Sequence, residues 1–140
     1  MLSPVPAPVD LIARIPLFAD LDPHESRVIA ESMKERRFEG GSVVVSEGES
    51  GVGFFVIGEG SARVTVGGRP VGELGAGDYF GEIALIGGVE RTATITAETD
   101  LVCYGMTSWA FKPLVESHAS IAWKLLQNLA RQLSQSDSRG

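Results

Sequence analysis

Residues 80–93, FGEIALIGGVERTA, bring glycines, a carboxylate and a guanidinium together in one short stretch. Gly81 removes a side chain at a point where the backbone can approach another group closely. Residues 82–86 favour a helix, and two glycines end it after little more than one turn. The start of such a turn presents unpaired N–H groups, and Arg91, at the beginning of the next strand, can fold back over it. A guanidinium beside free amides suits one phosphate group.

Glu82 adds a second requirement to this stretch. An ionised carboxylate only accepts hydrogen bonds, so its place beside an anion site predicts a ligand that also carries hydroxyl groups. A ligand that carries a phosphate and a sugar hydroxyl close together is a nucleotide, in which both groups belong to the ribose phosphate. A structural alternative stays open, in which Glu82 and Arg91 pair with each other and Gly81 only forms a turn.

The composition limits the class of protein. The chain has 140 residues, 44% of them hydrophobic and 21% charged, which indicates one soluble globular domain. Its formal charge of −6 argues against a surface that follows the phosphate backbone of a nucleic acid. Lys34, Arg36 and Arg37 cluster, but glutamates interleave with them, which favours a solvated helix end. Without a basic leader or a membrane-spanning apolar run, the expected location is cytoplasmic.

The glycines separate a β-rich middle from two helical flanks. Of the 17 glycines, 16 fall between Gly40 and Gly105. Gly67-Gly68 is a two-residue hairpin signal between two of the short β-rich runs in this region. Such runs predict an antiparallel sandwich or barrel. The runs are SVVVSE, GFFVIGE, SARVTV, RPVGEL, TATITAE and DLVCYGM.

The N-terminal flank carries a helix start signal. Asp22 is the expected N-cap, Pro23 the first helical residue, and Glu25 completes a capping box. The side chains expected to face the core from this segment are Leu21, Val28, Ile29 and Met33.

Two helices are expected after the last strand. Thr107 or Ser108 caps a short helix that Pro113 kinks or shortens. Its apolar residues are Trp109, Phe111 and Leu114. The last helix runs from about Ser117 to about Ser134, and its leucine-rich seam is short. The seam consists of Ala122, Leu126, Leu129 and Leu133.

The predicted fold is α+β and mainly β: an antiparallel, jelly-roll-like β-roll with an N-terminal helix and two C-terminal helices. The whole chain, 1–140, is expected to be a single domain. Its parts are a disordered lead (1–10), an N-terminal helical segment (11–39), the β-roll (40–106) with residues 80–93 inside it, and the C-terminal helices (107–135).

Side chains that could support catalysis are sparse. A metal-dependent enzyme of the cupin type shares the β-roll architecture, but it needs clustered ligands on its strands. The only histidines, His24 and His118, lie in the helical flanks. We therefore expect no metal site, no catalytic residues and no enzyme activity. Cys103 is the only cysteine, which excludes an internal disulfide, and its apolar surroundings predict a buried thiol.

FGEIALIGGVERTATI resembles the phosphate-binding cassette of the cyclic nucleotide-binding domain family, which includes kinase regulatory subunits, ion channels and the bacterial cyclic-AMP receptor protein. The family pattern is roughly F-G-E-[LI]-A-L, a short spacer, and R-[ASTP]-A-[TSA]-[VI]. VVVSEGESGVGFFVIGEGSARV resembles the second and third strands of the family. The resemblance covers about residues 11–135.

The resemblance implies a role for each residue of the cassette. Gly81 and the amide near Ala84 would approach the cyclic phosphate, and Arg91 would pair with its equatorial oxygen. Glu82 would accept a hydrogen bond from the ribose 2′-hydroxyl.

Two further positions fit the family pattern, and one departs from it. Thr92 would lie beside the phosphate and the base, and Ala93 would be small enough for the ligand to sit close. Glu90 stands where many kinase-type cassettes have proline. A carboxylate at this position also occurs in family members that are similar to the receptor protein.

The function that the resemblance implies is a non-catalytic sensor of a cyclic nucleotide. The expected ligand is cyclic AMP, with cyclic GMP as the alternative, and no cofactor. The C-terminal helices would move over the ligand as a lid. The base would be read by Arg131 and Gln132, or by Ser136 and Asp137.

Two alternatives to a stand-alone sensor stay open. One is a degenerate, nucleotide-free member that acts as a protein-interaction scaffold. The other is the N-terminal sensor part of a larger transcription regulator or channel. The expected partners are a second copy, through the last helix, or an effector protein. This chain alone is not expected to bind nucleic acid.

Overall fold

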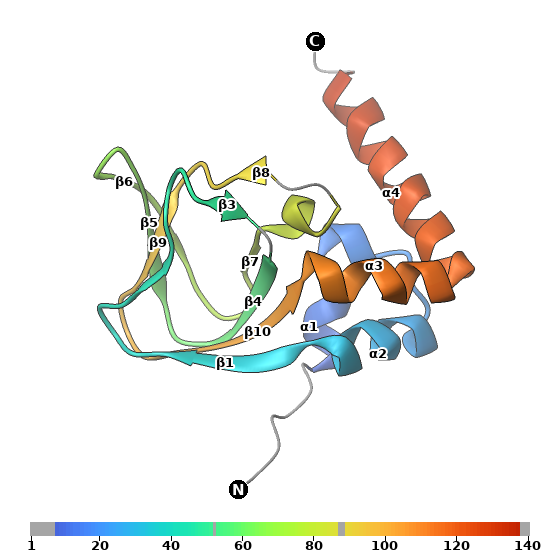
Figure 1. Cartoon of the computed structure of the whole chain (residues 1–140), viewed down its shortest axis with the longest axis horizontal. Coiled ribbons are helices and arrows are strands. Elements are labelled where there is room, and N and C mark those ends of the chain that lie inside the picture. The colour runs from blue at the N-terminus through green and yellow to red at the C-terminus, as the bar shows by residue number, and fades with distance from the viewer. Residues whose placement is uncertain (1–7, 52, 87–88, 138–140) are drawn as a thin grey trace, which may run out of the picture.

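The computed structural model of the chain describes residues 8–51, 53–86 and 89–137. Two four-stranded antiparallel sheets form a β-roll, and the helices gather at one end of it (Figure 1). The first sheet has the order β1 (Lys34–Phe38), β10 (Leu101–Thr107), β4 (Gly53–Glu59) and β7 (Tyr79–Phe80). The second has the order β2 (Val43–Val45), β9 (Thr94–Ala97), β5 (Ala62–Val66) and β6 (Arg69–Leu74). β3 (Ser50–Gly51) and β8 (Val89–Glu90) form a short ribbon.

The helical part consists of segments from both flanks. The N-terminal flank contains α1 (Val9–Ala13), the 3-10 turn η1 (Pro16–Phe18) and α2 (Pro23–Ser32). The C-terminal flank contains α3 (Ser108–Ser117) and α4 (Ala119–Asp137). A second 3-10 turn, η2 (Glu82–Leu85), lies between β7 and β8.

Strand β4 separates two hydrophobic clusters. Phe54 and Val56 are buried against the helices, whereas Phe55 and Ile57 belong to the cluster inside the roll. This alternation follows from the two-residue period of a strand. Both faces of β4 are therefore covered, and the strand anchors the helices to the roll.

Several local predictions are confirmed. The six predicted β-rich runs contain β2, β4, β5, β6, β9 and β10. Gly67 and Gly68 have φ angles of 58° and 80° and join β5 to β6 with Val66 opposite Arg69, as a two-residue hairpin requires. Helix α2 has the complete capping box between Asp22 and Glu25.

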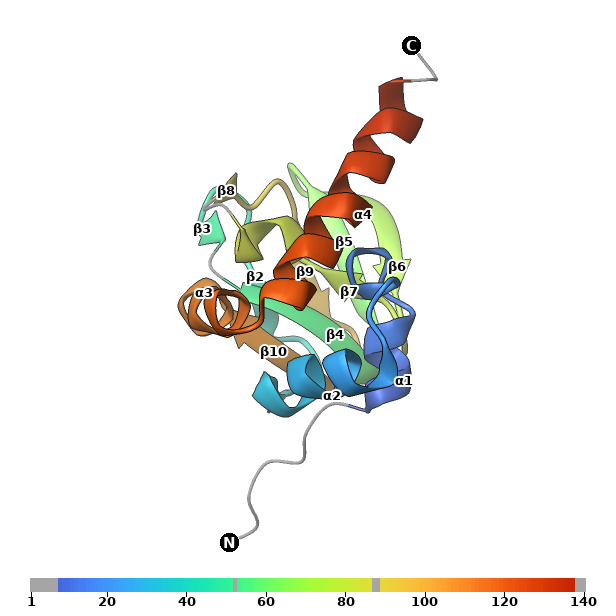
Figure 2. The same cartoon turned by 90° about the vertical axis from the view of Figure 1, so that its right-hand side faces the viewer.

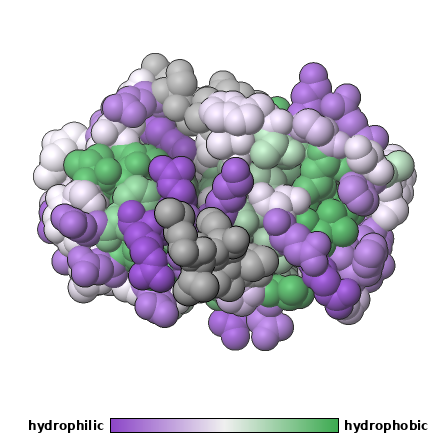
Figure 3. Space-filling model, turned by 60° about the horizontal axis from the view of Figure 1, so that its bottom comes forward, coloured by the Kyte–Doolittle hydropathy of each residue, from purple (hydrophilic) through white to green (hydrophobic). Residues whose placement is uncertain are grey.

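The N-terminal boundaries require two corrections. Lys34–Phe38 is not a solvated helix end but the edge strand β1, with Lys34 opposite Gly105 and Phe38 opposite Leu101. Charged side chains on an edge strand oppose pairing with another chain, which accounts for their presence here. Hydrophilic side chains cover much of the face turned forward in Figure 3. In addition, α1 begins at Val9, inside the predicted disordered lead, whose residues 1–7 lie outside the described part.

The two C-terminal helices form close to where they were predicted. Thr107 caps α3 by accepting a hydrogen bond from the Ala110 amide at 3.3 Å, and Pro113 lies inside this helix without ending it. In the predicted seam of α4, Leu126 and Leu133 are exposed, whereas Leu129 is half-buried and packs against the core. The last helix also begins and ends two to three residues later than predicted.

Candidate functional site

The cassette connects β7 of the first sheet to β9 of the second. β7 pairs with β4, with Phe80 opposite Phe55, and η2 follows it directly. The ribbon of β3 and β8 then leads to Arg91 (Figure 1). The Arg91 amide donates to the Glu49 carbonyl oxygen at 2.8 Å, and the Gly48 amide donates to the Arg91 carbonyl oxygen at 2.8 Å. The backbone of Arg91 is therefore fixed from both sides.

Gly81 occupies a position that admits no side chain. Its φ angle is 85°, in the region that favours glycine. A β carbon at this position would lie 2.5 Å from the Gly53 carbonyl oxygen and against the Arg91 guanidinium. The close approach that the sequence predicts for Gly81 is thus present, and the neighbouring groups are Gly53 and Arg91.

The Arg91 side chain folds back over Gly81, as predicted. Its Nη2 donates to the Gly53 carbonyl oxygen at 2.6 Å. This bond uses one of the five N–H donors of a guanidinium. Burial lowers the pKa of Arg91, but a guanidinium keeps its charge in proteins. No carboxylate among the described side chains forms an ion pair with Arg91.

The turn η2 confirms the short helix that was predicted after Gly81. The Ala84 amide donates to the Gly81 carbonyl oxygen at 3.0 Å, so it is already used inside the turn. The donors at the start of the turn are therefore the amides before Ala84. The Ala84 side chain is buried. The Gly87-Gly88 stop lies outside the described residues.

Of the other predicted site residues, the structure describes the side chains of Thr92 and Ala93 but not that of Glu82. Thr92 is exposed and Ala93 is half-buried, both next to Arg91 along the chain. The side chain of Glu82 lies outside the described part of the structure. Its predicted contact with a ribose and the alternative ion pair with Arg91 both stay predictions.

The residues predicted to read the base lie on α4. Arg131 pairs with Asp20, and Gln132 Nε2 donates to Asn128 Oδ1 at 2.5 Å. The end of α4 points away from the roll (Figures 1 and 2). In this arrangement the end of α4 does not lie over the described residues of the cassette. The side chains of the other two predicted base readers, 136 and 137, lie outside the described part.

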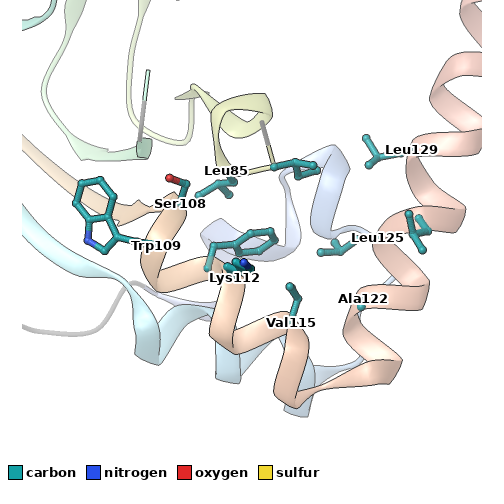
Figure 4. A pocket seen from close by; sticks show the side chains of 11 residues that line it. Leu85, Ser108, Trp109, Lys112, Val115, Ala122, Leu125 and Leu129 are labelled. Carbon is teal, nitrogen blue, oxygen red and sulfur yellow. The ribbon is translucent and has the colours of Figure 1, made fainter. Parts of the chain in front are cut away.

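The structure contains an apolar cavity beside the cassette that the sequence did not predict. It has a volume of about 510 Å³ and lies between η2, α3 and α4 (Figure 4). Leu85 and Ile86 line it on one side, Phe111 and Val115 on another, and Leu126 on the third. The leucine pattern of α4 was a signal for an apolar contact, but it did not indicate the partner.

A second hollow, of about 380 Å³, lies between β1 and the start of α3. Lys34 and Arg36 line it together with Phe55 and Trp109. Lys34 and Arg36, read from the sequence as part of a helix end, therefore face a concave surface.

Two further predictions concern metals and membranes. Among the described residues, no group of three or more histidine, cysteine or acidic side chains is arranged to hold a metal ion. In the same part of the chain, no helix is long and apolar enough to cross a membrane. Cys103 is buried, as predicted, and burial raises its pKa to about 11.

Comparison with known proteins identifies the family. The family profile described as "Cyclic nucleotide-binding domain" matches residues 35–118. The cAMP-dependent protein kinase regulatory subunit of Yarrowia lipolytica is 38% identical over 92 residues, which cover 64% of this chain and 24% of that protein. A cyclic nucleotide-gated potassium channel of Rhizobium etli is 38% identical over 112 residues, which cover 80% of this chain and 31% of that protein.

A solved structure agrees with this assignment. The N-terminal domain of a transcriptional regulator from Streptomyces coelicolor A3(2) superimposes with a TM-score of 0.87 at 27% identity, covering 93% of this chain and 94% of that one. The chain belongs to the cyclic nucleotide-binding domain family. It spans less than a third of the length of the two curated relatives.

Proposed function

We propose that this chain binds a 3′,5′-cyclic purine nucleotide, cyclic AMP, as a regulatory module without catalytic activity. The observation that supports this most is the position of Arg91 over Gly81. Within the described part of the chain, Arg91 bonds to a single acceptor, the Gly53 carbonyl oxygen, and its guanidinium lies against Gly81, the residue before η2. A guanidinium and the free amides at the start of a helical turn both suit one phosphate. In this proposal Glu82 accepts from the ribose 2′-hydroxyl, and Thr92 and Ala93 lie beside the ligand.

Calorimetry on Arg91→Ala tests the phosphate contact. We expect one nucleotide per chain and a loss of about 2–5 kcal/mol in binding free energy, the usual cost of removing one partner of a buried charge pair. Arg63→Ala, at an exposed arginine on β5, is the control and should bind as the wild type does. Equal affinity in Arg91→Ala would refute the assignment. The bond to Gly53 also predicts that Arg91→Ala melts at a lower temperature without ligand.

The role of Glu82 is tested by changing the ligand as well as the protein. The 2′-deoxy nucleotide should bind the wild type poorly, and Glu82→Ala should discriminate little between the two ligands. This design is a double-mutant cycle with one change in the ligand. Strictly additive losses would show that Glu82 does not contact the 2′-hydroxyl.

The base that we propose is adenine. We favour cyclic AMP, because R-T-A sequences occur in members of the family that take it. Thr92 could also accept a hydrogen bond from the exocyclic amine of guanine. Competition that shows cyclic GMP at least tenfold tighter, about 1.4 kcal/mol, would reverse the choice and make Thr92 a specificity residue.

The proposed signal is a movement of α3 and α4 over the ligand. The packed β-roll offers little freedom, whereas α4 leaves Trp123, Leu126 and Leu133 exposed. A ligand shifts such an equilibrium only if it contacts one position better than the other. Hydrogen exchange should therefore slow in residues 117–135 as well as in 80–93 when cyclic AMP binds. Protection of the cassette alone would leave a binding protein without this movement.

The same exposed face supports a second copy of the chain as partner, because exposed apolar side chains in a row favour helix pairing. Sedimentation with and without cyclic AMP tests this.

We also propose a cytoplasmic location, which fits a single cysteine that is buried and unpaired. The competing function is a nucleotide-free scaffold. Saturating cyclic AMP at 100 times its dissociation constant should stabilise a binder by about 2.7 kcal/mol, and an unchanged melting curve would favour the scaffold.

A further inference from the structure

Helix α4 is anchored to the body of the protein by few apolar side chains. Ile121 and Leu125 are buried, and Leu129 is half-buried. Beyond Leu129, no hydrophobic side chain in the described part of α4 is buried. Trp123 and Leu126 are 62% and 58% exposed. Within the described side chains of α4, the apolar anchoring therefore ends at Leu129.

A row of polar side chains provides a second set of contacts for α4. Ser120, Lys124 and Asn128 follow one another at intervals of four residues and so lie on one face. Lys124 Nζ donates to Glu25 Oε1 at 2.5 Å, and Ser120 Oγ donates to Glu25 Oε2. Glu25 is only 5% exposed and also completes the capping box of α2 by accepting from the Asp22 amide at 2.9 Å.

One turn further along, the row contacts the loop around η1. Asn128, also 5% exposed, donates through Nδ2 to the Pro16 carbonyl oxygen at 2.6 Å. Arg131 pairs with Asp20. Buried polar groups cost free energy when they lose their partners, so these bonds resist separation of α4 from α2 and η1.

The opposite flank of α4 faces the apolar cavity beside the cassette. Leu126 and Leu129 line the cavity on the helix, and Leu85 and Ile86 line it on and after η2 (Figure 4). A movement of α4 toward η2 would cover these side chains and gain hydrophobic burial. The same movement would separate the polar row from Glu25 and Asp20. The two positions of α4 therefore compete.

We propose that the polar contacts form a clamp that holds α4 away from the cassette and opposes its closure over a bound ligand. The clamp consists of Asp20, Glu25, Ser120, Lys124, Asn128 and Arg131. The inference rests on the proposed function, because closure is defined by the cyclic nucleotide. Only chains with an open clamp can close over the ligand. Because these chains are a small fraction of the total, the apparent affinity for the ligand is lower than the affinity of the open form.

Two variants loosen the clamp to different degrees. Lys124→Met keeps the aliphatic stem and removes the ammonium group. Ser120→Ala removes one hydroxyl from an exposed residue and is the milder change, which keeps the test valid if Lys124→Met folds poorly. Gln127→Met is the matched control, because Gln127 is an exposed residue of the same helix outside the clamp.

The first measurement uses the full chain without nucleotide. A helix released from its tertiary contacts is marginally stable, so its amides exchange faster. Hydrogen exchange in residues 119–137 should be about tenfold faster in Lys124→Met, about twofold faster in Ser120→Ala, and unchanged in Gln127→Met. Unchanged exchange in both folded clamp variants would overturn the clamp.

The second measurement is calorimetry with cyclic AMP. Lys124→Met should bind about fivefold more tightly than the wild type and Ser120→Ala about twofold, because more chains are open before binding. Equal or weaker binding by both variants, with a wild type that binds, would overturn the clamp and leave the proposed function intact. A wild type that binds no cyclic nucleotide would end the proposed function, and the exchange measurement alone would then decide on the clamp.

Discussion

Gly81→Ala is the most direct test of the backbone geometry under Arg91. An alanine at a φ angle of 85° is strained by about 1–2 kcal/mol. Its β carbon would also lie 2.5 Å from the Gly53 carbonyl oxygen, well inside van der Waals contact, and the backbone on one side must move. Such overpacking costs about 1–3 kcal/mol. We therefore expect the free energy of unfolding to fall by about 2–5 kcal/mol.

Two other glycines separate these contributions. Gly41 has a φ angle of 93°, but a β carbon there would meet no heavy atom within 4 Å, so Gly41→Ala should show only the strain of about 1–2 kcal/mol. Gly72, on β6, has open space around it and no positive φ angle. Gly72→Ala should change stability by less than about 0.5 kcal/mol.

Urea unfolding of the three variants and the wild type measures the differences in the free energy of unfolding. The comparison requires that the m-value, the slope of this free energy against urea concentration, is the same in all four proteins. The ranking should be Gly81→Ala, then Gly41→Ala, then Gly72→Ala, in order of decreasing loss. Gly53 also accepts the hydrogen bond from Arg91, so Gly81→Ala should weaken cyclic AMP binding as well. A loss for Gly81→Ala no larger than that for Gly41→Ala would refute the close packing of Gly81 against Gly53.

Three further predictions concern single side chains. Burial acts to raise the pKa of Glu25, but its hydrogen bonds outweigh burial and lower the pKa from 4.5 to about 2. The ionised Glu25 therefore contributes its full share of stability above pH 4.5, and this share is lost as the pH falls toward 2. Acid unfolding of Glu25→Gln should lack this pH-dependent loss. The Cys103 thiol, with its pKa raised to about 11, should react with a thiol reagent at pH 8 far more slowly in the folded chain than in urea, and equal rates would contradict its burial. Thr107→Ala should lower stability by about 1 kcal/mol through the loss of the α3 cap, which thermal unfolding checks against Thr107→Ser.

The features that the sequence predicted well depend on residues close together in the chain. The capping box of Asp22 and Glu25, the hairpin at Gly67-Gly68 and the single turn after Gly81 all follow from local backbone preferences. The β-rich runs were recognisable because they are short, alternate with turn residues and need only the period of a strand. The cassette itself was recognisable because its residue types and spacing are specific.

The features that only the tertiary structure decided depend on which distant segments meet. The charges of Lys34–Phe38 fit a helix end or an edge strand equally, and pairing with β10 selects the strand. The acceptor of Arg91 is Gly53, 38 residues earlier in the chain. Helix α4 docks through buried apolar side chains and through polar contacts to Glu25 on α2, and it leaves Leu126 and Leu133 exposed. Local patterns set most of the elements, whereas long-range contacts selected the strand at Lys34–Phe38 and set which face of each element is used.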